Sequence, residues 1–451
     1  MKKIIFLTTL LLVIVCGALP LVTSAQSSDK EFYGRPSYWR PYDQRGINVF
    51  ETPKAPDTMV YEGPRVRFGA GFTQQYQNLK HENNTALNNQ TTNRLYPLQS
   101  GFMTAQANLF MDVQLADGIH LNVTSYLSSR HHNETWVKGG YIQFDKLPFK
   151  GEFWTKLMEI TTIKVGHMEI NYGDDHFRRS DAGQTLYNPF MDNNIVDAFA
   201  TEIGGEVYLH KNGLFGMLGV TNGMMKGHID STYKTTTDDN TKRAPSIYLK
   251  GGIDKSLAEN IRVRVSGSFY HNSSNAGSGL TLYGGDRSGS NYQNVMEKAA
   301  AGVALPAGTA VAFSGRLNPG FSKKVNAIML NGFLKVKGVE LYGTYENAKG
   351  RTKAEATERK MNQLSADFVY RFGNAENLYI GARYNTVKAQ LAGITNDVKV
   401  DRTSLAAGWF VTKNVLMKGE YVVQNYKDFP TSDYRSGGKF KGFVVEAVVG
   451  F

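Results

Sequence analysis

The stretch FKGFVVEAVVGF, residues 440–451, decides the fold. Successive side chains of a strand point to opposite sides, so this stretch has two different faces. One face carries Phe443, Val445, Ala447, Val449 and Phe451, and the other includes Gly442, Glu446 and Gly450. Such alternation predicts a strand of a transmembrane β-barrel, in which one face meets lipid and the other meets water.

Further segments alternate in the same way along the chain. The clearest hairpin joins 103–113 to 119–127 through the turn Ala116-Asp117-Gly118, because Asp-Gly between two alternating runs is a strong turn signal. We predict sixteen strands, at 66–72, 103–113, 119–127, 135–145, 161–170, 198–210, 214–222, 245–254, 261–271, 324–336, 339–346, 361–372, 378–385, 401–410, 415–426 and 440–451.

The connections between these strands alternate between short and long. Short turns at 211–213, 337–338 and 411–414 contrast with long connections such as 171–197 and 272–322. This asymmetry is typical of outer-membrane barrels, whose periplasmic turns are short and whose external loops are long. An even number of strands puts both termini at the periplasmic end. The predicted fold class is therefore an all-β, antiparallel transmembrane barrel of about sixteen strands.

The chain divides into three predicted parts. Residues 1–25 have the charged start, apolar run and small-residue end of a signal peptide. Residues 26–63 do not alternate, and we expect an N-terminal extension on the periplasmic side. It could instead enter the lumen, cover a neighbouring subunit or form a loosely ordered tail. Residues 64–451 form the barrel. The only cysteine, Cys16, lies in the predicted signal peptide, so we expect neither disulfides nor thiolate chemistry.

Composition narrows the range of partners. Removing Lys2 and Lys3 with the signal peptide lowers the formal net charge from +11 to +9. The positive charges are scattered along strands and no nucleic-acid-binding motif is present, so we expect no nucleic acid as a partner. Outer-membrane lipid, lipopolysaccharide, and small anionic or neutral solutes are the expected partners.

The expected strand number predicts a water-filled lumen, because barrels of about sixteen strands are too wide for side chains alone to fill. Alternation places a set of basic residues on the lumen face: Arg65, Arg67, Lys250, Arg262, Arg264, Lys335, Arg383 and Lys418. Acidic residues share this face. The basic residues could attract anions, or they could pair with the acids across strands and stiffen the wall.

The connection 171–197 is the third of the long side, and we expect it to fold into the lumen and narrow it. Arg178 and Arg179 stand in tandem there, close to Asp174 and Asp175. At a pore constriction the arginines would set the local field, because guanidinium groups are always charged and bind carboxylates and phosphates. The alternative is a solvated loop in which the arginines pair with nearby aspartates.

An enzymatic alternative rests on His271 and Ser273. They are two residues apart on a strand and so share a face, as in outer-membrane acyl hydrolases that attack esters with a serine activated by a histidine. The short His-x-Ser pattern occurs often by chance, and we favour a non-enzymatic protein. His131 and His132 lack a second ligand cluster with metal spacing, so no metal and no cofactor are predicted.

The stretches IKVGHMEINYGDDHFRRSDAGQTLYNPF, residues 163–190, and NVLMKGEYVV, residues 414–423, are similar to the phosphate-selective porin O/P superfamily, in particular to its members from Bacteroidetes. The resemblance implies a homotrimeric outer-membrane porin of sixteen strands with an anion-attracting lumen. The chain lacks a matching ladder of lumen arginines and the clustered lysines of the family's phosphate site, so the resemblance does not extend to phosphate specificity.

Together these features predict an outer-membrane porin for passive diffusion of small hydrophilic solutes, with a preference for anions. Two other classes of function stay open at this point. One is the acyl hydrolase that uses Ser273 and His271. The other is a scaffold barrel of a larger outer-membrane complex, held through residues 26–63 or through the long connection 272–322.

Overall fold

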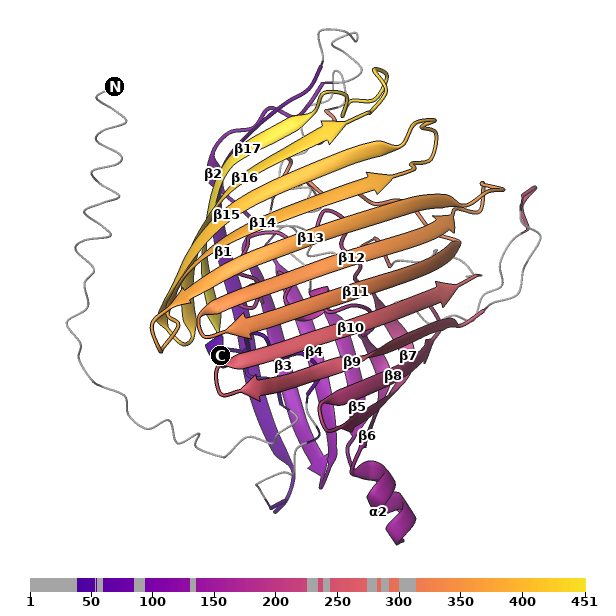
Figure 1. Ribbon diagram of the computed structural model, residues 1–451, viewed down its shortest axis with the longest axis vertical. Helices are drawn as coiled ribbons and strands as arrows, with labels where there is room; N and C mark the ends of the chain where they lie inside the picture. The colour runs from indigo at the N-terminus through magenta and orange to yellow at the C-terminus, as the bar shows by residue number, and fades with distance from the viewer. Residues whose placement is uncertain are drawn as a thin grey trace, which may run out of the picture.

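The computed structural model describes residues 39–52, 54, 60–84, 94–129, 135–224, 234–237, 244–273, 282–284, 292–299 and 314–451. Their strands form one antiparallel sheet, which closes through the pairing of β1 (Arg65–Glu82) with β17 (Lys439–Gly450). β2 (Gly101–Phe102) and β3 (Gln106–Ala116) both pair with β1 and form one interrupted strand. The wall is therefore a closed barrel of sixteen strands, which confirms the predicted fold (Figure 1).

Each strand pairs with the next along the chain. The other strands are β4 (Ile119–Ser128), β5 (Thr135–Phe144), β6 (Thr161–Glu169), β7 (Thr201–Lys211), β8 (Leu214–Thr221), β9 (Ser246–Ala258), β10 (Ile261–Asn272), β11 (Lys324–Val336), β12 (Val339–Arg351), β13 (Arg359–Phe372), β14 (Leu378–Ala389), β15 (Val398–Thr412) and β16 (Val415–Lys427).

Short connections gather at one end of the barrel, which we call the turn end, and long connections at the other, which we call the loop end. β1 starts and β17 finishes at the turn end. One short connection contains the helix α2 (Glu152–Met158), which the sequence did not predict and which projects beyond the wall (Figure 1). No helix within the described part of the chain is both long and apolar enough to cross a membrane.

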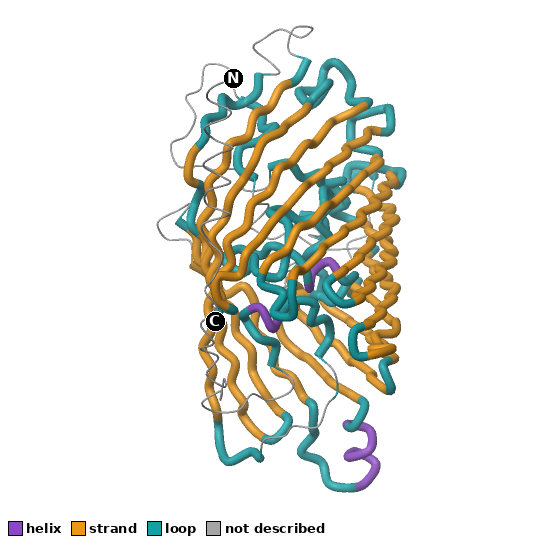
Figure 2. Tube along the Cα trace, turned by 60° about the vertical axis from the view of Figure 1, so that its left-hand side comes forward, coloured by secondary structure: helices purple, strands orange, loops and turns teal. Residues whose placement is uncertain are grey.

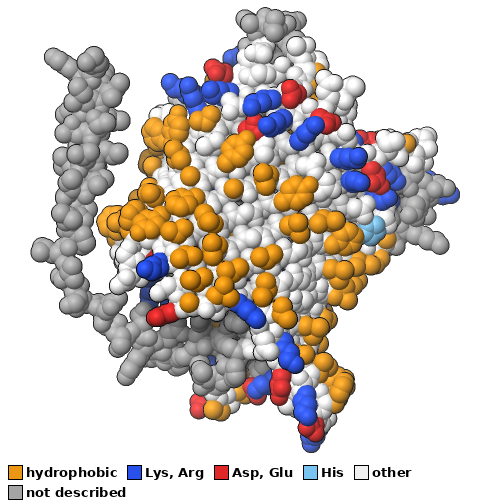
Figure 3. All heavy atoms as spheres, in the orientation of Figure 1, with side chains coloured by type: hydrophobic (Ala, Val, Ile, Leu, Met, Phe, Trp, Pro, Cys, Tyr) orange, Lys and Arg blue, Asp and Glu red, His pale blue; other side chains and the backbone are white. Residues whose placement is uncertain are grey.

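Alternation separates two faces in every long strand. On β13, Leu364 and Phe368 point outward and are 50% and 42% exposed. Asp367, on the opposite face of the same strand, points toward the lumen and is only 4% exposed. Outward apolar side chains form a broad band over the visible face, with Lys and Arg side chains along its upper border (Figure 3). Such a band is the surface that a transmembrane barrel presents to lipid.

Several strands continue further toward the loop end than the sequence indicated. β12 was predicted to end at 346 and β14 at 385, but they extend to Arg351 and Ala389. Among these additional residues, outward positions hold Lys349 on β12 and Lys388 on β14 instead of apolar residues. Backbone pairing persists there although the alternation of apolar and polar residues ends, so alternation places the ends of these strands too early.

Candidate channel interior

The third long connection, residues 170–200, lies inside the barrel (Figure 2). It carries apolar residues among its Asp, Asn and Gly residues, and these apolar side chains pack away from water. Met191 and Ile195 are fully buried, and Val196 is 1% exposed. The backbone N–H groups of Ile195 and Val196 donate to the side chains of Asn385 and Gln363 on β14 and β13.

Basic side chains of the wall hold this third connection through its backbone carbonyls. The Lys418 ammonium on β16 donates to the carbonyl oxygens of Thr185, Asn188 and Phe190 at 3.0–3.1 Å. Arg402 on β15 donates to the carbonyl of Asn193 at 2.7 Å and forms an ion pair with Asp192 at 2.8 Å. The connection is therefore attached both by apolar packing and by charged hydrogen bonds.

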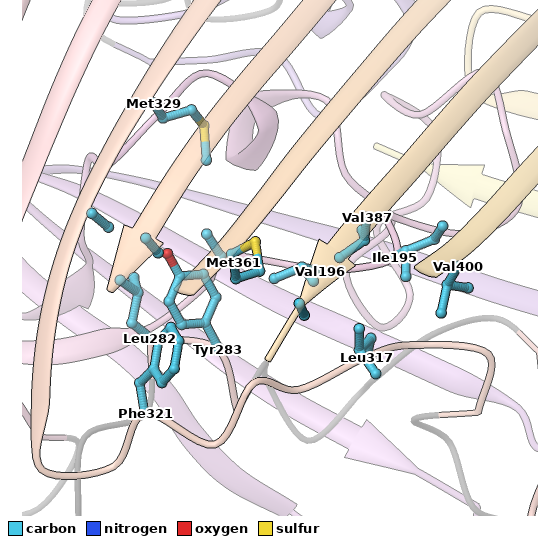
Figure 4. Close-up of a cluster of buried hydrophobic side chains, with 14 of the residues drawn as sticks. Ile195, Val196, Leu282, Tyr283, Leu317, Phe321, Met329, Met361, Val387 and Val400 are labelled. Carbon is cyan, nitrogen blue, oxygen red and sulfur yellow. The ribbon is translucent and has the colours of Figure 1, made fainter. Parts of the chain in front are cut away.

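Part of the fifth long connection, residues 273–323, also lies inside. Leu282, Tyr283, Leu317 and Phe321 pack with inward side chains of the wall and with the third connection (Figure 4). Wall residues on this side include Met329, Met361, Val387 and Val400. Periodicity in the sequence predicted neither this insertion nor an apolar inner wall, because alternation does not report where a connection lies.

The N-terminal segment, of which the structure describes residues 39–52 and 54, crosses the lumen near the turn end. The Tyr42 hydroxyl donates to Asp112 on β3 at 2.8 Å, and the Asn48 amide donates to Glu340 on β12 at 2.6 Å. Lys54 pairs with Asp145, which follows β5, at 2.9 Å. Of the alternatives for residues 26–63, the contacts of this described part favour entry into the lumen.

Four charged residues join the N-terminal segment and the third connection to the wall, and we call them the ion cluster: Glu51, Asp174, Lys250 and Arg264. Glu51 of the N-terminal segment lies 2.8 Å from the Lys250 ammonium and 2.6 Å from the Arg264 guanidinium. Asp174 of the third connection lies 2.7 Å from each of the same two groups. All four side chains are at most 4% exposed, so the charges are desolvated and depend on each other.

The cluster also determines the protonation of its acids. Burial alone would raise the pKa of Glu51, but Lys250 and Arg264 lower it from 4.5 to about 2. The pKa of Asp174 is also below its ordinary value, because the same two cations outweigh the effect of burial. Both acids are thus charged at neutral pH and keep the cluster intact.

The predicted constriction residues all lie in the interior, in separate contacts. Asp174 belongs to the ion cluster, whereas Asp175 accepts hydrogen bonds from Tyr342 and Thr344 at 2.5 and 2.7 Å. Arg178 lies 3.7 Å from Glu340 and also contacts Asn48 of the N-terminal segment. Arg179 lies 3.1 Å from Asp181 and pairs with Asp197 within the third connection.

Most of the predicted lumen-lining basic residues pair with a carboxylate. Besides Lys250 and Arg264 of the ion cluster, the pairs are Arg67–Asp112, Arg262–Asp254, Lys335–Glu376, Arg383–Asp367 and Lys418–Glu446. Arg65 lies at the turn end and donates to the carbonyl of Val60 at 2.9 Å. The structure therefore favours the pairing alternative for these side chains.

Three residues that hold the interior together were missed. One is Arg402, described above, and another is Arg371 on β13, which pairs with Glu340 at 2.8 Å. Both could have been found, because each occupies an inward position of a predicted strand. Glu51 had no such signal, because it lies in the extension that does not alternate. Its partners on β9 and β10 are distant in sequence, and only the folded barrel brings them together.

A cavity of about 280 Å³ remains between the inserted segments and the inner wall of β3 to β7. Its polar lining includes His120, Thr124, Lys138, Lys164 and Arg179. The Lys164 ammonium lies 5.1 Å from the ring centre of Tyr141 and 5.0 Å from that of Tyr208. A second cavity of about 300 Å³ lies at the turn end beside Lys54, Asp254 and Arg262. The free lumen is therefore narrower than the strand number alone indicated.

The remaining candidate sites from the sequence are the His271–Ser273 pair and the two histidines His131 and His132. His271 is bonded through Nδ1 to the side-chain oxygen of Asn326 at 2.5 Å. Asn326 lies on the neighbouring strand β11, so the contact directs His271 toward β11 and gives no support for a catalytic pair with Ser273. His131 and His132 lie outside the described residues, as does the predicted signal peptide. Within the described ranges, no cluster of three His, Cys or acidic residues could hold a metal ion.

No model of a known protein family matches this sequence, and no curated protein sequence matches it. Solved outer-membrane proteins resemble its structure. The outer membrane channel DcaP of Acinetobacter baumannii has a TM-score of 0.50 at 10% identity, over 86% of this chain and 98% of that chain. OmpT, an outer membrane protein of Vibrio cholerae, in its trimer form has a TM-score of 0.48 at 10% identity, over 86% and 100%. The likeness to DcaP shows that the two share a fold.

Proposed function

We propose that the chain is an outer-membrane channel through which small hydrophilic solutes diffuse passively. The observation that carries this proposal is the closed sixteen-strand barrel with apolar side chains outside and charged side chains inside. Charged groups face the interior of a membrane-spanning barrel at low cost only where water or opposite charges solvate them. The proposal includes export by a signal peptide at residues 1–25 and a periplasmic location for the turn end of the barrel.

The proposed route follows the inner wall of β3 to β7. This is where the cavity of about 280 Å³ lies, whereas the inner wall of β11 to β16 is covered by the third and fifth connections. Selectivity then comes from the width and charge of the cavity, and no chemical step is involved. The N-terminal segment lies across the turn end of the same route.

We also propose an anion preference, and we expect it to be weak. The formal net charge of +9 that remains after removal of the signal peptide supports it, as do the positions of Lys138, Lys164 and Arg179 beside the cavity. Among the described residues, six carboxylates line the same cavity and oppose it: Glu51, Asp112, Asp145, Glu169, Asp181 and Glu206. Membership of the phosphate-selective porin O/P superfamily, and the homotrimer that it implies, remain part of the proposal.

Planar lipid bilayers provide the test. The purified protein should produce discrete conductance steps. Across a salt gradient, its reversal potential should indicate a slight preference for anions over cations. Lys164→Gln should move this potential toward cations, whereas Lys388→Gln, at an exposed position near the loop end, should not. A protein that inserts without conducting ions would refute the channel, and a reversal potential on the cation side would refute the anion preference alone.

A further inference from the structure

The outward face of the barrel carries a row of lysines near the loop end, which we call the lysine row. It consists of Lys80, Lys349, Lys360, Lys388, Lys399, Lys427 and Lys441, on β1, β12 to β16 and β17. Figure 3 shows basic side chains along this border of the apolar band, with Asp and Glu side chains among them. The row therefore follows the outside of the wall and does not belong to the lumen.

The strand register places these lysines directly opposite one another. Lys349 faces Lys360, Lys388 faces Lys399, Lys399 faces Lys427, and Lys80 faces Lys441. Directly opposite side chains have Cβ atoms about 4.5–5.5 Å apart, and like charges at this distance destabilise the pair. The four contacts along this row therefore require negative charge, from the chain itself or from a partner outside it.

Carboxylates of the chain balance the row only in part. Asp397 lies 3.0 Å from Lys388, and Asp401 lies 2.7 Å from Lys427 and 3.4 Å from Lys399. Within the part of the chain that the structure describes, no carboxylate lies within ion-pair distance of Lys349, Lys360, Lys80 or Lys441. These four side chains are exposed and can reach a partner.

The surface next to the row is suited to an amphiphile. Toward the turn end, outward positions four residues from Lys349, Lys360 and Lys388 hold Tyr345, Leu364 and Tyr384, and the outward position two residues from Lys441 holds Phe443. Each of these four side chains is 44–50% exposed. An ammonium group above an exposed aromatic or aliphatic side chain matches a molecule with a phosphate head and an apolar tail. A free phosphate ion would use the lysines but not the apolar surface beside them.

We propose that the lysine row binds the phosphorylated headgroups of an anionic outer-leaflet lipid, whose acyl chains lie on the apolar band. This inference rests on the proposed function, because it requires the barrel to span a membrane with its loop end outward. The lipid phosphates supply the negative charge that the opposed lysines lack. Binding also relieves the repulsion between strands, so the lipid stabilises the wall.

The test uses the full-length protein in phosphatidylcholine nanodiscs with and without bisphosphorylated lipid A. The variant Lys349→Gln/Lys360→Gln/Lys388→Gln/Lys427→Gln removes most of the row, and Lys146→Gln/Lys156→Gln at the turn end is the matched control. Lipid A should raise the unfolding temperature of the wild type and of the control but not that of the row variant. In phosphatidylcholine alone the row variant should be at least as stable as the wild type, because its like-charge contacts are removed.

Two outcomes would overturn the proposal. One is equal stabilisation of the wild type and the row variant by lipid A. The other is the same stabilisation of the wild type by inorganic phosphate or by dephosphorylated lipid A, which would show that either the tail or the phosphate alone is sufficient. Conductance of the same preparations separates this result from a failure of the channel proposal, because a row variant that conducts is folded and inserted.

Discussion

The two sides of the lumen differ in what fills them. Against β11 to β16 the inner wall is apolar toward the loop end, and Ile195 and Val196 of the third connection pack on it. Against β3 to β7 the inner wall is polar and a cavity of about 280 Å³ remains. One side thus fixes the inserted segments and the other leaves room for solute. The difference teaches that a barrel of this width can be packed along one side of its lumen and hollow along the other.

The largest expected effect comes from filling the hollow side. Thr124 on β4 lines the cavity, and Val123 beside it faces outward. Thr124→Trp places an indole in the cavity and should abolish most of the single-channel conductance, whereas Val123→Trp should leave it near the wild-type value. If both variants conduct like the wild type, the route does not follow β3 to β7.

The second prediction concerns the ion cluster at the border of the two sides. Lys250→Met leaves Glu51 and Asp174 with Arg264 as their remaining cation. Breaking a buried pair in this way typically costs about 3–5 kcal/mol. We expect this loss in the free energy of unfolding, measured with urea in detergent. The double variant Lys250→Met/Glu51→Met should recover part of it, and no recovery would show that the cluster does not act as a unit.

The third prediction concerns the packed side. Ile195 is fully buried, so Ile195→Ala should lower the free energy of unfolding by about 2–5 kcal/mol. Thr124→Ala, in the cavity, should change it by no more than about 0.5 kcal/mol, because water can replace the lost group. Equal effects at the two positions would mean that the two sides are packed alike.

The smallest effect is expected from pH. The folded pKa of Glu51 is lowered from 4.5 to about 2, so its stabilising contribution is present above pH 4.5 and is lost as the pH falls toward 2. The N-terminal segment should then loosen, and conductance should rise over this window. Glu51→Gln should remove this rise. A rise that persists in the variant would assign it to other groups.

The alternation of apolar and polar residues predicted the closed barrel and its strand number. A strand that buries a single face needs an apolar residue at every second position, and this pattern is visible in the sequence. It also placed Lys250 and Arg264 on the inner face. It could not show that Glu51 and Asp174 meet them, since those acids lie in segments without periodicity. Nor could it show the inward apolar patch that receives Ile195, because apolar residues on both faces of β14 and β15 blur the alternation.

The contacts of the third connection have a consequence for assembly. The connection precedes β7, yet its partners Gln363, Asn385, Arg402 and Lys418 lie on β13 to β16, which come much later in the chain. These partners exist as a surface only after the last hairpins have joined the sheet. The third connection can therefore make these final contacts only once β13 to β16 are in place, although it is earlier in the chain than all four strands.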